Sequence, residues 1–186
     1  MELFKAIHTR YSVARVRPDP IPRNVIEQLL AAAVQAPNHH HNRPWHFVVL
    51  YGAARERLGK VMAHSQAQRV PDTSAAALDV ERKRPLRAPV LIAVGIDPPG
   101  EPKISEIENI CAGAAAVENL LLAAHDLGLG AIWRTGAAAT DPAVKVFLGF
   151  TPGQHLIALI YLGYPELEQA LYERSSYLDR VKWLEE

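Results

Sequence analysis

The stretch SEIENICAGAAAVENLLLAAHDL, from Ser105 to Leu127, is the longest periodic segment of the chain. Its inner part is rich in alanine and carries few charges apart from Glu118. A helix that is apolar nearly all round must be buried on most sides, and small side chains let a second helix approach closely. The stretch therefore predicts a long helix in the core of the domain that also contributes to a dimer interface.

Strand and helix patterns surround this helix along the chain. Gly128 and Gly130 follow it, and glycine suits the left-handed backbone of a helix C-terminal cap. The apolar run from Val90 to Gly95 has the pattern of a strand covered on both faces, which predicts a position inside a sheet. Further strands are expected at 44–52, 131–134 and 155–163, and further helices at 3–9, 24–35, 53–68 and 142–148. The charged segment 70–87 is only partly consistent with a helix.

This order of elements predicts an α+β, or mixed α/β, domain with a central mixed sheet flanked by helices. A chain of 186 residues fits one domain, spanning 1–186. The segment 166–186 has aromatic side chains at Tyr172, Tyr177 and Trp183. We expect it to dock on a protein surface, such as that of a partner subunit.

Bulk composition excludes several classes of protein. Hydrophobic residues make up 49% and charged residues 22% of the chain, which is ordinary for a globular domain. Twenty basic residues balance twenty acidic ones, so neither nucleic acid nor a membrane is an expected partner. No signal-peptide pattern or charge-free membrane span is present. With Cys111 as the only cysteine, expected to be a small buried apolar residue, the sequence predicts a soluble cytoplasmic protein.

Familiar catalytic signatures such as a phosphate loop, a nucleophile elbow or a zinc helix are absent from the sequence. A first polar cluster, from Arg10 to Arg15, joins two guanidinium groups and the hydroxyl of Ser12 after a helix end. Arginine binds phosphate through charge-assisted hydrogen bonds, and serine adds a neutral donor. A phosphate clamp is one interpretation; a solvated basic loop is the other, and composition alone favours it.

A second polar cluster, APNHHHNRPW at 36–45, lies between an expected helix and an expected strand. Three consecutive histidines suggest a metal, but adjacent side chains diverge and the spacing matches no structural zinc pattern. We therefore predict no metal site. A polar exposed loop is the plainer interpretation of this cluster.

Four motifs, taken together, resemble the flavin-dependent nitroreductase family. They are R-x-S at 10–12, A-P-N-H at 36–39, P-W-H-F at 44–47 and G-x-G-x-x-W-R-T-G at 128–136. Their order and spacing are most similar to a short, single-domain branch of NAD(P)H nitroreductases, and the resemblance covers about residues 5–164. It implies the nitroreductase fold as an intertwined homodimer with two FMN sites at the interface.

The resemblance also implies a role for each segment. The FMN phosphate and ribityl chain would be held by Arg10, Tyr11 and Ser12, with Arg15 nearby. Residues that approach the flavin from the other subunit would be Pro37, Asn38, His39 and Arg43. Gln35, at the end of the preceding helix, could also reach the cofactor. The isoalloxazine edge or the phosphate side would be lined by Trp133, Arg134 and Thr135, with Ile132 and Gly136 adjacent.

The sequence departs from the family pattern at two of these positions. The second basic residue usually stands two positions after the serine, where this chain has Ala14, and Arg15 follows it. Arg43 replaces the usual glutamine before Pro-Trp, and its charge would favour the reduced, anionic flavin. Trp45 is better interpreted as a core aromatic, whereas Trp133 fits the core and the site equally well.

The function implied is electron transfer from NADH or NADPH, through FMN, to a nitroaromatic, quinone or similar electron-poor acceptor in a ping-pong cycle. No side chain has to act as a catalytic nucleophile, because the flavin carries the chemistry. Two alternatives stay open: a flavin-binding or interaction module without efficient turnover, and a metal-binding protein built on the histidine loop.

Overall fold

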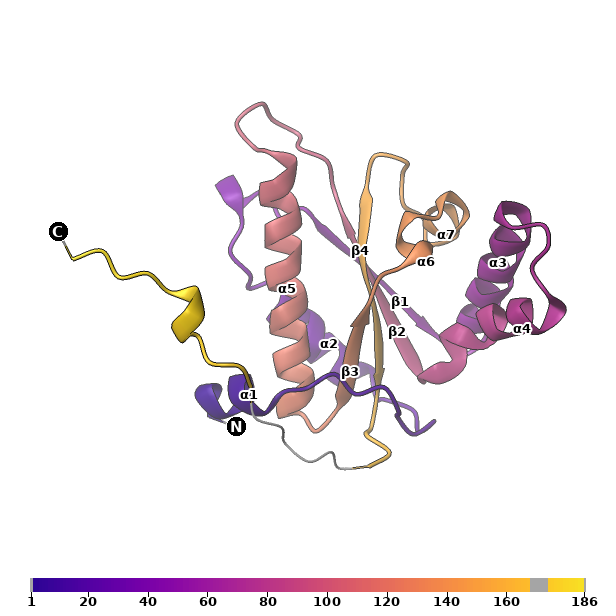
Figure 1. Ribbon diagram of the computed structural model, residues 1–186, viewed down its shortest axis with the longest axis horizontal. Coiled ribbons are helices and arrows are strands. Elements are labelled where there is room, and N and C mark those ends of the chain that lie inside the picture. Colours follow the sequence, from indigo (N-terminus) through magenta and orange to yellow (C-terminus); the bar gives the residue numbers. More distant parts are fainter. Residues whose placement is uncertain (1, 168–173, 186) are drawn as a thin grey trace.

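The fold is known from a computed structural model, which describes residues 2–167 and 174–185. A four-stranded sheet lies at its centre in the order β1-β2-β4-β3 (Figure 1). The strands are β1 (Trp45–Tyr51), β2 (Val90–Ile96), β3 (Gly130–Arg134) and β4 (His155–Gly163). All seven residues of β2 are buried, which confirms the prediction that this apolar run lies inside the sheet.

Helices cover both faces of the sheet and create two apolar cores. One face packs against α2 (Arg23–Ala33) and α5 (Glu106–Asp126), and the other against α3 (Ala53–Arg69), α6 (Ala137–Thr140) and α7 (Pro142–Phe147). The uncertain segment 70–87 forms α4 (Ala75–Lys83) and the 3-10 turn η2 (Arg84–Arg87), and α4 packs on α3. The N-terminal α1 (Leu3–Thr9) lies against the C-terminal end of α5 (Figure 1).

Helix α5 crosses one face of the sheet, as its apolar pattern predicts. Ser105 and Glu108 form a capping box that satisfies backbone N–H groups at its start. Gly113 lies at the crossing point, where an added Cβ would come within 2.2 Å of Ile96 Cδ1. Among the described residues, α5 is the helix that could cross a membrane by length and composition, but its packing on the sheet identifies it as a core helix.

The predicted mixed sheet needs correction, because each strand pair in the described part of the chain is antiparallel. The chain makes its crossover from β2 through α5 to β3, so these two strands run in the same direction. Strand β4 then inserts between them and pairs with both. Strands β2 and β3 are therefore parallel to each other, but β4 separates them and they are not hydrogen-bonded to each other.

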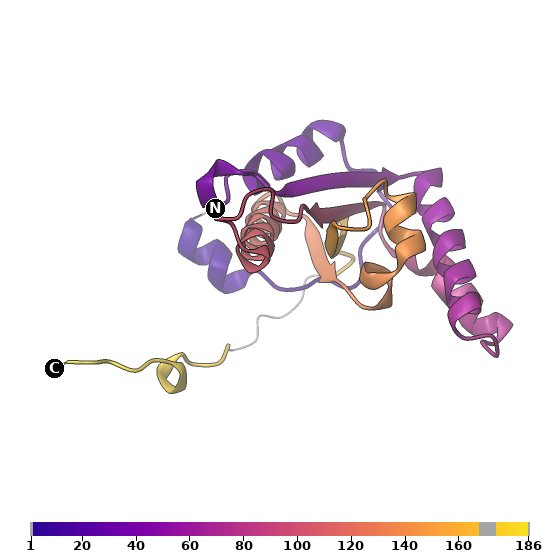
Figure 2. The same cartoon turned by 90° about the horizontal axis from the view of Figure 1, so that it is seen from above.

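Three further expectations concern Cys111, Trp45 and the C-terminal segment. Cys111, predicted to be buried, is exposed, because it lies on the face of α5 that points away from the sheet. Trp45 is buried with 8% of its surface exposed, which confirms it as a core aromatic. The C-terminal segment, which includes the turn η3 (Leu178–Arg180), extends away from the body (Figures 1 and 2). Tyr177 and Trp183 are exposed there, and Tyr172 lies outside the described residues.

Candidate cofactor site

The first candidate segment begins where α1 ends. The Arg10 backbone N–H caps α1 by donating to the Ala6 carbonyl at 2.9 Å. The Val13 N–H donates to the Ala131 carbonyl of β3 at 3.0 Å. Gly130 makes this close approach possible, since an added Cβ would lie 2.7 Å from Val13 Cγ1. Residues 10–13 therefore span from the end of α1 to the edge strand β3, which places the first predicted cluster beside the start of the motif at 128–136.

Side chains of helix α5 contact the start of this segment. Arg10 Nε lies 3.3 Å from Glu118 Oε1, and the Arg10 side chain is 19% exposed. His125 Nε2 lies 2.8 Å from the hydroxyl of Thr9, and its ring meets that of Tyr11 edge to face. Burial, followed by the positive charge of Arg10, lowers the pKa of His125. Ser12 and Arg15 are exposed to solvent.

The second candidate segment is a tight loop with an unusual backbone. His40, His41 and Arg43 have φ angles of 47°, 53° and 49°, which non-glycine residues seldom adopt. The Asn38 side chain closes the loop by accepting a hydrogen bond from the Arg43 N–H at 2.9 Å. Such backbone strain is typical of functional sites.

This loop is attached to the N-terminal end of α5. His39 Nε2 lies 3.2 Å from Glu108 Oε1, and Asn42 donates to Asn109 at 2.6 Å. With Cys111 and Ile107, the start of the loop lines a shallow cavity of about 400 Å³. Gln35 precedes the loop, exposed, with its side chain bonded to the Ala31 carbonyl. In the part of the chain that the structure describes, no three His, Cys, Asp or Glu side chains gather into a metal-binding group.

The third candidate segment is the end of β3 and the turn after it. Trp133 is half-buried and its Nε1–H donates to the Ile157 carbonyl at 2.9 Å. Ile132 and Arg134 face the opposite side of the sheet, where the Arg134 guanidinium lies 5.9 Å from the centre of the Tyr161 ring. Burial raises the pKa of Tyr161.

A cavity of about 310 Å³ opens beside this segment. Trp133, Arg134, Thr135 and Gly136 line it, together with five residues that the sequence did not suggest: Met62, Arg84, Ala138, Leu159 and Tyr161. Arg84 pairs with Glu81, and its Nε is buried without a hydrogen-bond partner. The only sequence signal for Arg84 was the concentration of charge in the segment 70–87.

The three segments do not converge within one subunit. Glu108, which binds the histidine loop, and Glu118, which binds Arg10, are ten residues apart on α5. At the rise of an α-helix that separation is about 15 Å along the axis. The Arg10 segment, with the start of β3 beside it, therefore lies toward the C-terminal end of α5, and the loop at 37–43 lies at the N-terminal end.

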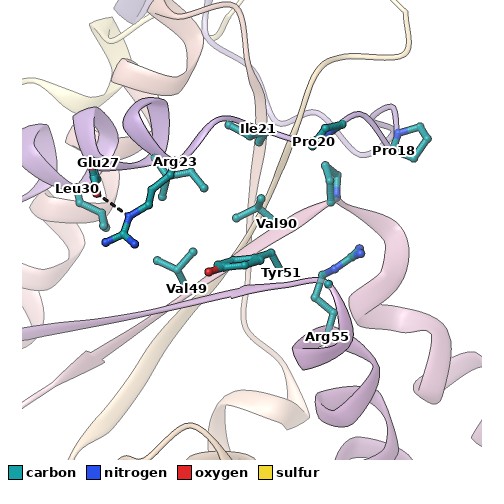
Figure 3. A pocket seen from close by; sticks show the side chains of 13 residues that line it. Pro18, Pro20, Ile21, Arg23, Glu27, Leu30, Val49, Tyr51, Arg55 and Val90 are labelled. Carbon is teal, nitrogen blue, oxygen red and sulfur yellow. Dashed lines mark hydrogen bonds and ion pairs between the residues drawn. The ribbon is translucent and has the colours of Figure 1, made fainter.

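A separate cavity of about 590 Å³ lies between α2 and the edge strand β1 (Figure 3). Its lining is mainly apolar, with the ion pair Arg23–Glu27 (2.8 Å) and Tyr51 at its rim. None of the predicted site residues line this cavity.

The sequence matches a known protein family and a relative of known sequence. The family model described as "Nitroreductase family" matches residues 7–164. Over 168 residues the chain is 30% identical to the Escherichia coli K12 protein named "Putative NAD(P)H nitroreductase YdjA". This alignment covers 90% of this chain and 91% of that protein.

Solved structures share the fold at lower identity. A nitroreductase-like family protein from Bacillus cereus superposes with a TM-score of 0.87 at 24% identity, covering 100% of this chain and 97% of that one. A Bacteroides fragilis nitroreductase with bound FMN gives a TM-score of 0.76 at 24% identity, with 100% coverage of both chains. The nitroreductase NfnB of Mycobacterium smegmatis, in complex with NADPH, gives a TM-score of 0.77 at 16% identity. The superposition covers 98% of this chain and 97% of that one. By the family match and the identity to the E. coli protein, this chain belongs to the nitroreductase family.

Proposed function

We propose that this protein is an FMN-dependent oxidoreductase that passes electrons from NADH or NADPH to an electron-poor organic acceptor. The observation that carries the proposal is the contact of the Arg10–Val13 segment with both α5 and the free edge of β3. That contact joins two of the three segments to which the family resemblance assigns FMN. Nitroaromatics and quinones are the acceptor classes we propose, in a ping-pong cycle.

The donor chemistry of these residues fits FMN. The guanidinium groups of Arg10 and Arg15 and the hydroxyl of Ser12 are suited to a phosphate. The end of β3 and the turn after it would offer the aromatic ring of Trp133 and backbone N–H groups to a planar ring system. A related structure that contains FMN supports the assignment.

A homodimer would complete the site. Because the histidine loop lies about 15 Å along α5 from Arg10, one bound cofactor meets both more easily if the loop comes from a second subunit. Apolar side chains that a partner would cover are exposed on α1 and α5, namely Leu3 (65%), Phe4 (76%), Ile7 (44%) and Ile107 (62%). The projecting C-terminal segment, with Trp183 75% exposed, is proposed to dock on the same partner.

In this arrangement FMN would supply the redox chemistry by taking hydride from the nicotinamide and passing electrons to the acceptor. The chain's own residues would bind and orient. Arg10 and Ser12 would fix the phosphate, and Arg43 would bring positive charge to the flavin ring. His39, whose Nε2 lies 3.2 Å from Glu108 Oε1, would be placed to contact the flavin or the acceptor. We propose that this takes place in the cytoplasm.

Steady-state oxidation of NADH and NADPH, with a nitroaromatic and with a quinone, tests the proposal. Arg10→Gln should lose FMN and activity. Arg17→Gln is the matched control, because Arg17 is exposed and paired with Asp19. If purified protein holds FMN that neither nicotinamide reduces, it is a flavin-binding module and not an enzyme. Stoichiometric metal in chelator-free protein without flavin would support the metal-binding alternative instead.

A further inference from the structure

The contact between α1 and α5 holds the residue that precedes the proposed phosphate segment. Thr9 is the last residue of α1, and its Oγ1 lies 2.7 Å from the Lys5 carbonyl and 2.8 Å from His125 Nε2. His125 is on the last turn of α5. Two elements far apart in the sequence are thus joined through one hydroxyl group.

The chemistry of this contact fixes the direction of both hydrogen bonds. A threonine hydroxyl has a single proton, and a carbonyl oxygen can only accept. The Thr9 hydroxyl therefore donates to Lys5 and accepts from His125, which carries its proton on Nε2. Neutral and protonated histidine can both make this bond.

A second contact lies on the same face of α5. Glu118 is seven residues before His125, which is two helical turns, so both side chains point to α1. Glu118 holds the Arg10 guanidinium at 3.3 Å, and the ring of Tyr11 meets His125 edge to face with centroids 6.5 Å apart. Three consecutive residues, from Thr9 to Tyr11, are therefore anchored on two side chains of one rigid helix.

We propose that His125 is a positioning residue for FMN: through Thr9 it fixes the end of α1, so that Arg10 and Ser12 stand ready for the phosphate. This inference rests on the proposed function. His125 itself need not touch the cofactor. Its contribution is preorganisation, because a segment that is already ordered loses less conformational freedom when the phosphate binds.

The test compares FMN affinity, measured by flavin fluorescence, in full-length variants. His125→Leu removes the donor, whereas His125→Gln keeps an N–H at a similar reach. We expect about five-fold weaker binding in the leucine variant, the loss typical of one hydrogen bond, and near-complete rescue by glutamine. His8→Leu is the matched control, since His8 is an exposed histidine on the same α1.

A double-mutant cycle separates positioning from general destabilisation. In a Thr9→Val background, the effect of His125→Leu on FMN affinity should disappear, because the bond is already lost. Equal affinity of the leucine variant and the wild type would overturn the inference, as would additive effects in the cycle or a glutamine variant as weak as leucine.

Hydrogen exchange on flavin-free protein distinguishes failure of this inference from failure of the proposed function. The Arg10 amide, bonded to Ala6, should exchange faster in His125→Leu and not in His8→Leu. If the wild type binds no FMN, the proposed function fails, and with it the role toward FMN. Unchanged exchange at Arg10 would overturn the anchoring itself.

Discussion

Subunit complementation should reveal that each site draws on two chains. Arg10→Ala and His39→Ala should each abolish most FMN-dependent turnover when expressed alone. The structure places Arg10 and His39 about 15 Å apart along α5, so in the proposed dimer they serve different sites. A mixed dimer would then contain one site with both changes and one site with neither.

The magnitude of the rescue follows from random pairing. If the two variants are co-expressed equally, about half of the dimers are mixed, and roughly a quarter of all sites are native. Turnover of NADH or NADPH should therefore recover to about a quarter of the wild-type value per subunit, by the same pairing argument. Co-expression of Arg10→Ala with Ser12→Ala is the control without rescue, because both changes fall on one segment. Absence of recovery with Arg10→Ala and His39→Ala would refute the two-subunit site.

Three further changes test the fold around the site. Gly130→Ala should weaken FMN binding in a fluorescence titration, because a Cβ there would lie 2.7 Å from Val13. Wild-type FMN affinity in this variant would contradict the proposed role of the close contact between Val13 and β3. Leu120→Ala, at a fully buried position of α5, should cost about 2–5 kcal/mol in urea unfolding, and a much smaller loss would mean a looser core. His125 has a lowered pKa, so below about pH 6.5 the unfolded chain binds more protons and stability should fall as the pH decreases. His125→Gln should make the free energy of unfolding less dependent on pH below about pH 6.5. An unchanged slope in this pH range would argue against a lowered pKa of His125.

The secondary structure could be predicted closely because local patterns determine it. The expected helix at 3–9 is observed with those bounds, and the strand predicted at 90–95 is one residue longer, ending at Ile96. The sheet pairing could not be predicted, since nothing local specifies that β4 inserts between β2 and β3. The exposure of Cys111 was missed for a related reason, because an alanine-rich helix does not reveal which of its faces meets the sheet.

The site residues could be predicted as sequence segments but not as an arrangement. Arg10 and Trp133 were selected by motif, and the structure brings their segments together through the Val13–Ala131 bond. The anchoring residues Glu118 and His125 had no motif, because their role depends on how α1 packs on α5. Arg84 was missed because the segment that carries it lacks clear periodicity, and only the packing of α4 and η2 brings it to the end of β3.

The visible absorption spectrum of the purified protein, before and after anaerobic addition of NADH or NADPH, tests the central claim most directly. We predict an oxidised-flavin spectrum with FMN in every subunit, which bleaches with one of the two nicotinamides and returns when a quinone or nitroaromatic is added. A colourless protein that does not take up added FMN would contradict the proposed cofactor site. A flavin spectrum that neither nicotinamide changes would contradict the proposed electron transfer.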